Sequence, residues 1–366
     1  MHSAKTLLED PTRLAEVEAR YLMGPADARA LGYSIAWQFP GAGADPSLIS
    51  IHDEAVLTID AQNFVTFIDR DSGDRAWRQN VASASERVLG LTYYPELDRV
   101  YVLTETQVVT LDSDTGQPLM LNAGRMTQEL EWVAASPPIA VGNLLCYGAR
   151  SGQLVWQNQK MGFFWQAYQI GGAVNLAPVL SGNTLVAIAS NGAIAAMNAS
   201  TASRLWETQL LSGITAPPAI GPDALFIAGL DQYLRCYDLQ TGRTVWKILT
   251  DTRLVDGPTL LGDRIYQQIP GMGLVCLEAT PLDQPGGVEH WTCKESNGVA
   301  VARHDHRVIT WDDASKILGT IDLASGRTID SISLPTASLI VPGSQTNGDL
   351  FIVDDAGEVL RLTPRH

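Results

Sequence analysis

The chain has 366 residues, of which 45% are hydrophobic, so it is long enough to bury a large core. Its 40 Asp and Glu residues against 25 Lys and Arg give a net charge of −15. This charge argues against nucleic acid and anionic lipid surfaces as partners, because both would be repelled. No apolar run approaches the length of a membrane span, so we expect no transmembrane segment. No secretory signal opens the chain, but Met1-His2-Ser3 reads as the remnant of a cloning tag, so a removed leader stays open.

Residues 1–31 form a first segment that lies outside the repeat described below. The spacing of Leu14, Val17 and Tyr21 is typical of a helix over Pro11–Met23, and Pro11 suits a first helical turn. Ala26–Leu31 could add a further turn. We therefore predict a short helical arm over residues 1–31, packed on the rim of a domain that spans 32–366. Docking of this arm to a partner is the alternative.

A short turn followed by a tryptophan recurs along the rest of the chain. The clearest copies, residues 68–77 and 237–246, share the pattern Asp-x-x-Ser/Thr-Gly-x-x-x-Trp. Met120 and Asp330 stand where two of the copies would carry the tryptophan. The spacing is about 42 residues, which is typical of one blade of a β-propeller. The turn positions are Gly73, Gly116, Ala202, Gly242, Gly287 and Gly326.

Each repeat unit predicts four strands. In one unit, period-two alternation and β-branched residues predict strands at 214–220, 224–228, 232–237 and 243–247. In the turn before the last strand, Asp and Thr side chains can bond the local backbone and glycine accepts a positive φ. A tryptophan on the last, outer strand would bury its ring between neighbouring blades. We predict this blade-docking role for Trp37, Trp77, Trp206, Trp246 and Trp291.

Counting the units predicts eight blades. The third blade, over residues 143–170, is atypical, since Lys160-Met161-Gly162 replaces the usual turn. We expect Phe163 and Phe164 after this turn to pack inside the fold, with partner contact as the alternative. The eighth blade, over 337–362, lacks an outer strand, and Tyr33–Gln38 has the pattern of one. The fold class is therefore all-β: an eight-bladed β-propeller of four-stranded antiparallel blades, closed by an N-terminal strand and preceded by a short helix.

Cysteine and histidine spacing does not predict a metal site. Cys146, Cys236, Cys276 and Cys293 contain no C-x-x-C pair, so buried free thiols are expected, with a Cys276–Cys293 bridge left open. His304 and His306 flank Asp305 and could share a metal ion, but a solvated loop is the expected arrangement.

The turns between the second and third strands of the blades should all lie at one end of the central channel. Acidic residues dominate these turns, and Arg150 is the clear exception. Such a ring would attract a basic partner segment or a cation. The alternative is that hairpin turns favour aspartate for backbone reasons. The residues of this predicted acidic mouth are Asp60, Glu105, Asp231, Asp312, Asp313, Asp354 and Asp355.

The turn and tryptophan pattern resembles the pyrroloquinoline-quinone (PQQ) repeat over roughly residues 33–362. That resemblance implies an eight-bladed propeller from one of two classes: quinoprotein dehydrogenases, or non-catalytic proteins similar to the assembly factor BamB. Quinoproteins hold their cofactor with long inserted loops, a stacked tryptophan, a calcium site and often a disulfide between adjacent cysteines. This chain has short blades and no adjacent cysteines.

We therefore predict a non-catalytic, BamB-like scaffold of the cell envelope or periplasm, with no cofactor. It would be a monomeric propeller that binds a protein partner whose identity the sequence does not name. A quinoprotein-type dehydrogenase, or another small-molecule-binding propeller that uses the channel mouth, is the alternative. An intracellular interaction propeller is a third possibility.

Overall fold

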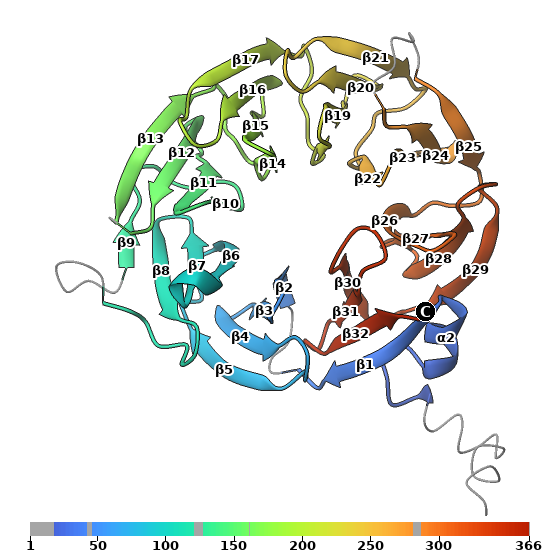
Figure 1. The fold of residues 1–366 in the computed structure, drawn as a ribbon, viewed down its shortest axis with the longest axis horizontal. Coiled ribbons are helices and arrows are strands. Elements are labelled where there is room, and N and C mark those ends of the chain that lie inside the picture. Colours follow the sequence, from blue (N-terminus) through green and yellow to red (C-terminus); the bar gives the residue numbers. More distant parts are fainter. Residues whose placement is uncertain (1–17, 42–45, 121–126, 161, 281–286, 366) are drawn as a thin grey trace, which may run out of the picture.

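A computed structural model describes residues 18–41, 46–120, 127–160, 162–280 and 287–365. Its strands form eight four-stranded sheets arranged as blades around a central channel (Figure 1). Every paired strand in a blade runs antiparallel to its neighbour, and each blade runs from an inner strand beside the channel to an outer strand on the rim. The predicted eight-bladed propeller is confirmed.

The first four blades follow the chain from residue 46, and a short 3-10 helix, η1 (Pro95–Leu97), lies within the second. Blade 1 contains β2 (Pro46–Ile51), β3 (Ala55–Asp60), β4 (Phe64–Asp69) and β5 (Arg75–Asn80). Blade 2 contains β6 (Val88–Tyr94), β7 (Arg99–Thr104), β8 (Gln107–Asp112) and β9 (Thr127–Glu129). Blade 3 contains β10 (Ile139–Val141), β11 (Leu144–Gly148), β12 (Gln153–Asn158) and β13 (Phe163–Gln169). Blade 4 contains β14 (Val179–Ser181), β15 (Thr184–Ile188), β16 (Ala193–Asn198) and β17 (Arg204–Gln209).

The last four blades complete the ring. Blade 5 contains β18 (Ala219–Ile220), β19 (Ala224–Ala228), β20 (Tyr233–Asp238) and β21 (Thr244–Leu249). Blade 6 contains β22 (Thr259–Leu261), β23 (Arg264–Ile269), β24 (Gly273–Glu278) and β25 (Glu289–Cys293). Blade 7 contains β26 (Val299–His304), β27 (Arg307–Asp312), β28 (Ile317–Asp322) and β29 (Thr328–Ser333). Blade 8 contains β30 (Ala337–Pro342), β31 (Leu350–Asp354), β32 (Val359–Pro364) and β1 (Tyr33–Phe39).

The core lies between the blades. Side chains of a strand alternate between its two faces, so Leu57 and Ile59 of β3 pack toward blade 2 while Val56 packs toward blade 8. The buried apolar residues accordingly form eight clusters, each shared by two successive blades. Both faces of each blade are therefore covered, and a blade depends on its two neighbours for burial.

The repeated turn docks each blade onto the one before it. In blade 5, Asp238 Oδ1 accepts hydrogen bonds from the Thr241 backbone N–H (2.8 Å) and hydroxyl (2.6 Å). This holds Gly242 at φ +71°, and the indole of Trp206 from blade 4 lies against that glycine. Trp206 Nε1 also donates to the Leu239 carbonyl (2.8 Å). The turn needs glycine because a Cβ at position 242 would stand 2.5 Å from the ring.

The same contact recurs around the ring, and all five predicted docking tryptophans make it. Each indole lies against the positive-φ glycine of the next turn, in the pairs Trp37–Gly73, Trp77–Gly116, Trp206–Gly242, Trp246–Gly287 and Trp291–Gly326. The blade-docking role predicted for these tryptophans therefore has a direct geometric basis.

Exceptions to the pattern have physical causes. In blade 3, Trp156 comes from the third strand, β12, and donates to the Ala199 carbonyl (2.9 Å) of a turn that carries Ala202 in place of glycine. In blade 7, Asp330 stands at the docking position, and blade 8 has no turn between its third and outer strands because these come from opposite ends of the chain. Met120 of blade 2 is 73% exposed.

The ring closes through the N-terminal strand, as predicted. β1 pairs antiparallel with β32, from Tyr33 opposite Pro364 to Phe39 opposite Val359. Trp37 of β1 then docks onto blade 1, where its Nε1 donates to the Arg70 carbonyl (2.9 Å).

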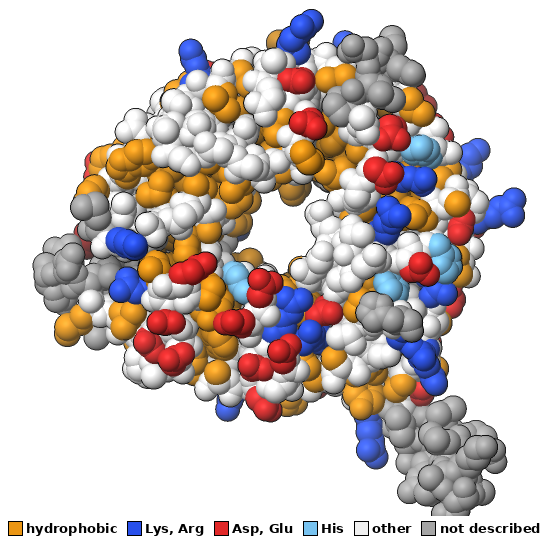
Figure 2. Space-filling model, viewed as in Figure 1, with side chains coloured by type: hydrophobic (Ala, Val, Ile, Leu, Met, Phe, Trp, Pro, Cys, Tyr) orange, Lys and Arg blue, Asp and Glu red, His pale blue; other side chains and the backbone are white. Residues whose placement is uncertain are grey.

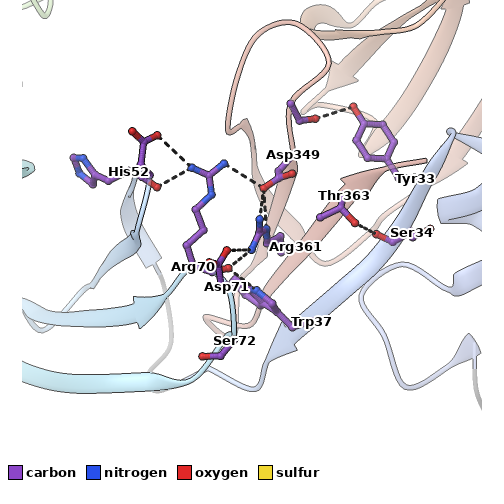
Figure 3. A network of polar contacts seen from close by, with 12 residues as sticks. Tyr33, Ser34, Trp37, His52, Arg70, Asp71, Ser72, Asp349, Arg361 and Thr363 are labelled. Atoms are coloured by element: carbon purple, nitrogen blue, oxygen red, sulfur yellow. Dashed lines mark hydrogen bonds and ion pairs between the residues drawn. The ribbon is translucent and has the colours of Figure 1, made fainter. Parts of the chain in front are cut away.

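A charged cluster reinforces this seam (Figure 3). Asp349 accepts hydrogen bonds from Arg361 Nε (2.8 Å) and from Arg70 (3.2 Å), and all three side chains are largely buried. Arg361 also donates to the Arg70 carbonyl, and Arg70 donates to the His52 carbonyl (2.8 Å). One carboxylate thus joins two guanidinium groups from blades 1 and 8.

The N-terminal segment contributes one described helix, α2 (Pro25–Ala30). Ala28 and Leu31 are buried with Tyr33 of β1 and Ile332 of β29, so α2 packs on the rim beside blades 7 and 8 (Figure 1). Residues 11–17 of the helix predicted over Pro11–Met23 lie outside the described residues, and residues 19–23 form turns and bends, so the prediction that the helix extends to Met23 is wrong. The boundary at residues 31/32 stays a prediction.

The docking contact predicts a coupled pair of mutations. Trp206→Ala should lower the free energy of unfolding by about 3–5 kcal/mol, and Gly242→Ala by about 1–3 kcal/mol because it forces a Cβ into the indole. The double variant should lose less than the sum, since both changes remove one contact. Gly142→Ala is the control, because its φ is also positive but a Cβ there meets open space. Additive losses in urea unfolding would contradict the contact.

The seam predicts that Asp349→Ala costs about 3–5 kcal/mol of unfolding free energy, because two buried guanidinium groups lose their counter-ion. Hydrogen exchange should show β32 and β1 losing protection before the other strands. Asp53→Ala, which removes a fully exposed carboxylate 3.9 Å from Arg70, is the control and should leave the melting temperature unchanged. Equal effects of the two variants would argue against the seam cluster.

Candidate functional site

The turns between the second and third strands all lie at one end of the ring, because successive blades repeat the same strand directions. Every residue of the predicted acidic mouth falls in such a turn. Asp60 ends β3, Glu105 lies between β7 and β8, and Asp231 lies between β19 and β20. Asp312 ends β27 and Asp313 follows it, and Asp354 ends β31 and Asp355 follows it. The structure thus brings the predicted residues to one face, while their role in binding stays a prediction.

Several of these carboxylates bond the backbone of their own turn. Asp60 Oδ1 accepts the N–H groups of Gln62 (2.9 Å) and Phe64 (3.0 Å). Asp354 Oδ1 accepts those of Ala356 (3.0 Å) and Glu358 (2.8 Å), and only 6% of Asp354 is exposed. Asp312 Oδ1 likewise accepts from two backbone N–H groups of its turn. These contacts supply the backbone reason for aspartate that the sequence left as the alternative.

Several carboxylates of the predicted acidic mouth are also paired with cations. Asp60 pairs with Arg78 (2.6 Å), and Asp313 pairs with Lys316 (2.7 Å). Glu105 of blade 2 pairs with Arg150 of blade 3 (3.0 Å), so the basic exception in the predicted ring is the partner of one of its acids. The negative potential at this face is therefore smaller than the sequence alone indicates.

Asp231 and Arg235 form the most enclosed of these pairs. The guanidinium of Arg235 holds both carboxylate oxygens of Asp231 and is only 11% exposed. The hydrogen bonds from Arg235 lower the pKa of Asp231, because they favour its charged form. Arg235 also lies over the ring of Tyr233, 4.8 Å from its centroid. This pair stabilises the blade 5 hairpin.

Sequence reasoning missed Asp256, which lies between blades 5 and 6. Burial raises the pKa of Asp256, and the negative charge of Asp312 raises it further. The loop that leads from one blade to the next ends on the same face as the second-to-third turns. An acidic residue in that loop was the signal that could have identified it.

A cavity of about 480 Å³ opens beside blades 1 and 2 on this face. Glu86 lies in its wall, and its carboxylate accepts hydrogen bonds from Thr104 (2.6 Å), Thr106 (2.9 Å) and Gln107 (3.2 Å). Arg87 beside it is exposed. Asp60, Asn63, Pro137 and Asn175 also line the cavity. Its wall is polar and carries both signs of charge.

The histidines and cysteines do not form a site. His304 is buried and lies 4.8 Å from the ring of Tyr33, so the expected solvated loop is wrong for His304, while His306 is exposed and bonds Asp305 (2.9 Å). All four cysteines are free and buried, and burial raises the pKa of Cys276 to about 11. Within the described ranges, no three His, Cys, Asp or Glu side chains gather in a way that could hold a metal ion. The described helices also include none with the length and apolarity to cross a membrane.

The aromatic residues after the atypical turn of blade 3 are not packed inside. Phe163 is 49% exposed and Phe164 is 38% exposed, so the expectation that they pack inside the fold is wrong. Trp165, which follows them, is 41% exposed. The docking of blade 3 by Trp156 explains why none of these rings is needed between blades.

Comparison with known proteins identifies a family. The model of the family described as outer membrane protein assembly factor BamB matches residues 37–248 and 212–363. A curated BamB of Francisella salina is 39% identical over 69 residues, an alignment that covers 19% of this chain and 13% of that protein.

Two solved structures share the fold. BamB from Moraxella catarrhalis is similar with a TM-score of 0.68 and 17% identity, covering 91% of this chain and 98% of that one. The computationally designed protein Ika8 is similar with a TM-score of 0.69 and 14% identity, covering 89% and 98%. At such identities these likenesses show the fold alone.

The Asp231–Arg235 pair predicts a pH-dependent effect. Asp231→Asn should cost about 1.5–3 kcal/mol of unfolding free energy at neutral pH, because it removes charged hydrogen bonds from a buried guanidinium. Since the folded pKa of Asp231 is lowered, this contribution is complete above the unfolded pKa of about 4 and is lost as the pH falls through the folded value. Urea unfolding from pH 7 to pH 3 should show the gap between parent and variant narrow only below about pH 4. Asp313→Asn, with an exposed pair, is the control.

The predicted acidic mouth should act by charge. Changing Asp312, Asp313, Asp354 and Asp355 to Asn should leave folding almost intact, because the amide oxygen can still accept the backbone N–H groups. It should weaken binding of calcium or a basic peptide, most clearly at low salt. Isothermal titration at two salt concentrations measures the binding of calcium and of the peptide. Identical binding by variant and parent would mean that these residues only form turns.

Proposed function

This chain belongs to the family of outer membrane protein assembly factor BamB, and we propose that it is a non-catalytic scaffold that holds protein partners together in the bacterial cell envelope. The family model matches from Trp37 in the closing strand to Thr363 in β32, so it takes in blades at both ends of the chain. That coverage carries the proposal. We place the protein in the periplasm by the same resemblance.

The geometry at the channel mouth supports a binding role rather than catalysis. Asp60, Asp231 and Asp354 bond a turn backbone or an arginine of their own blade, and Glu105 joins two blades. These charged groups stabilise the ring. The surfaces left for function are the exposed turns and the outer strands, which are surfaces that suit a protein partner.

Gene deletion in the source bacterium tests the role in outer-membrane protein assembly. Loss of the protein should lower the amount of folded outer-membrane β-barrel proteins, measured by heat-modifiable gel mobility, and the full-length gene should restore it. Fractionation of the native protein tests the location. Normal β-barrel levels in the deletion strain, or recovery of the native protein with the cytoplasm, would contradict the proposal.

The polar cavity beside Glu86 favours a second candidate, the binding of a small molecule at the channel mouth. A quinoprotein-type enzyme is the form of this candidate that the repeat suggests. Adding PQQ with calcium and measuring cofactor absorbance and dye reduction tests it. Bound cofactor with dye reduction would replace the scaffold proposal.

A further inference from the structure

One outer strand of the ring, β13, differs from the others. Of the eight outer strands, only β1 and β13 contain no Lys, Arg, Asp or Glu, and charged residues on an edge strand normally prevent it from pairing with another chain. β13 is hydrogen-bonded on one side only, to β12, within the part of the chain that the structure describes.

The other uncharged edge is covered by the chain itself. α2 lies beside β1 at the rim (Figure 1). The backbone N–H of Leu22 donates to Gln38 Oε1 of β1 (2.9 Å), and Met23 and Leu31 are buried in the same cluster as Tyr33. Residues 22–31 thus cover the uncharged edge strand β1. This indicates that a peptide segment is a suitable cover for the other uncharged edge, β13.

β13 carries an aromatic surface that the fold does not use. Phe163, Phe164 and Trp165 are all more than a third exposed, and Trp132 touches Phe164 edge-on, 5.0 Å between ring centroids. A cavity of about 310 Å³ lies beside Trp165 and is lined by Val141, Leu144, Asn158 and Ser200 among others. Exposed aromatics next to a pocket are the usual anchor points of protein interfaces.

Charge around β13 sets this sector apart from the rest of the protein. The sequence from 132 to 206 contains no Asp or Glu, in a chain that carries 40 of them. In this stretch, Arg150 pairs with Glu105 of blade 2, and Arg204 pairs with Glu207. The exposed Lys160 forms no ion pair with any described residue. In Figure 2 the area over blades 3 and 4 is largely white and orange, whereas Asp and Glu gather over blades 1, 2 and 8.

From these observations we infer that the outer edge of β13 receives an extended, apolar segment of a partner protein, which adds a fifth strand to blade 3. The segment's backbone pairs with the free edge, its apolar side chains contact Phe163 and Trp165, and a carboxylate pairs with Lys160. A segment that carries a carboxylate is repelled by the acidic blades but not by the sector around β13. The inference rests on the proposed scaffold function and names the class of partner.

A labelled synthetic peptide tests this inference directly. In the probe, valine or tyrosine alternates with threonine and one position holds aspartate, and fluorescence anisotropy measures its binding to the full chain. Phe163→Ser with Trp165→Ser should weaken binding by about tenfold or more, as for loss of an aromatic anchor. Lys160→Glu should weaken it mainly at low salt. Leu249→Ser with Ile329→Ser, on the exposed outer strands β21 and β29, is the matched control and should bind as the parent does.

Two further measurements separate strand addition from adhesion to an apolar surface. Hydrogen exchange should show new protection in β13 when the peptide binds, and a peptide of the same composition with its apolar residues grouped at one end should bind weakly. Equal binding by the double variant and the parent, or protection that spares β13, would overturn the inference. A parent dimer that the double variant dissociates would also overturn it, since a second copy would then cover the edge.

The scaffold proposal is judged separately. If the double variant loses peptide binding but still restores β-barrel protein levels in the deletion strain, the scaffold function does not depend on a partner at β13. The inference about β13 is then wrong, and the scaffold function stands.

Discussion

The structure depends on one repeated interaction, the packing of a tryptophan ring against a left-handed glycine in the next blade. A blade alone would expose both faces, because alternate residues of each strand point to opposite neighbours. The indole adds a large buried area at the rim and its N–H fixes the register through a turn carbonyl, as Trp206 does with Leu239. The interaction links local backbone conformation to the contact between blades, so turn and ring form together.

Closure uses the same interaction in a different covalent setting. Blade 8 takes its outer strand from the N-terminus, and Trp37 on that strand docks on blade 1 as the other tryptophans dock on their neighbours. At the seam, β1 and β32 are joined by noncovalent contacts alone, because no turn connects them. The charged cluster of Asp349 with Arg70 and Arg361 lies at this seam and stabilises it. A buried cluster of this kind is sensitive to the loss of any member.

Charge is distributed unevenly in a protein with a net charge of −15. At the channel mouth many of the carboxylates accept hydrogen bonds from turn backbones or form ion pairs with arginines. The number of carboxylates therefore overstates the negative potential they produce. Blades 3 and 4 lack carboxylates almost entirely, and the rim of blade 3 carries exposed aromatic rings. This contrast makes the ring asymmetric. A negatively charged partner that is repelled by the acidic blades can approach the sector of blades 3 and 4. A scaffold needs such an asymmetry, because eight similar blades otherwise offer eight similar docking places.

The sequence by itself determined the eight blades, the strand order and the closing strand, because these follow from local requirements. A positive φ favours glycine, an Asp–Thr pair caps the turn, and a tryptophan at near-constant spacing marks five of the outer strands. Tertiary structure alone decided how side chains from different blades meet. In blade 3, Trp156 of the third strand takes the docking role that an outer-strand tryptophan has elsewhere, so Phe163 and Phe164 stay exposed. Glu105 pairs with Arg150 across the boundary between blades 2 and 3. These outcomes depend on contacts between residues about one repeat apart, whose geometry no local pattern specifies.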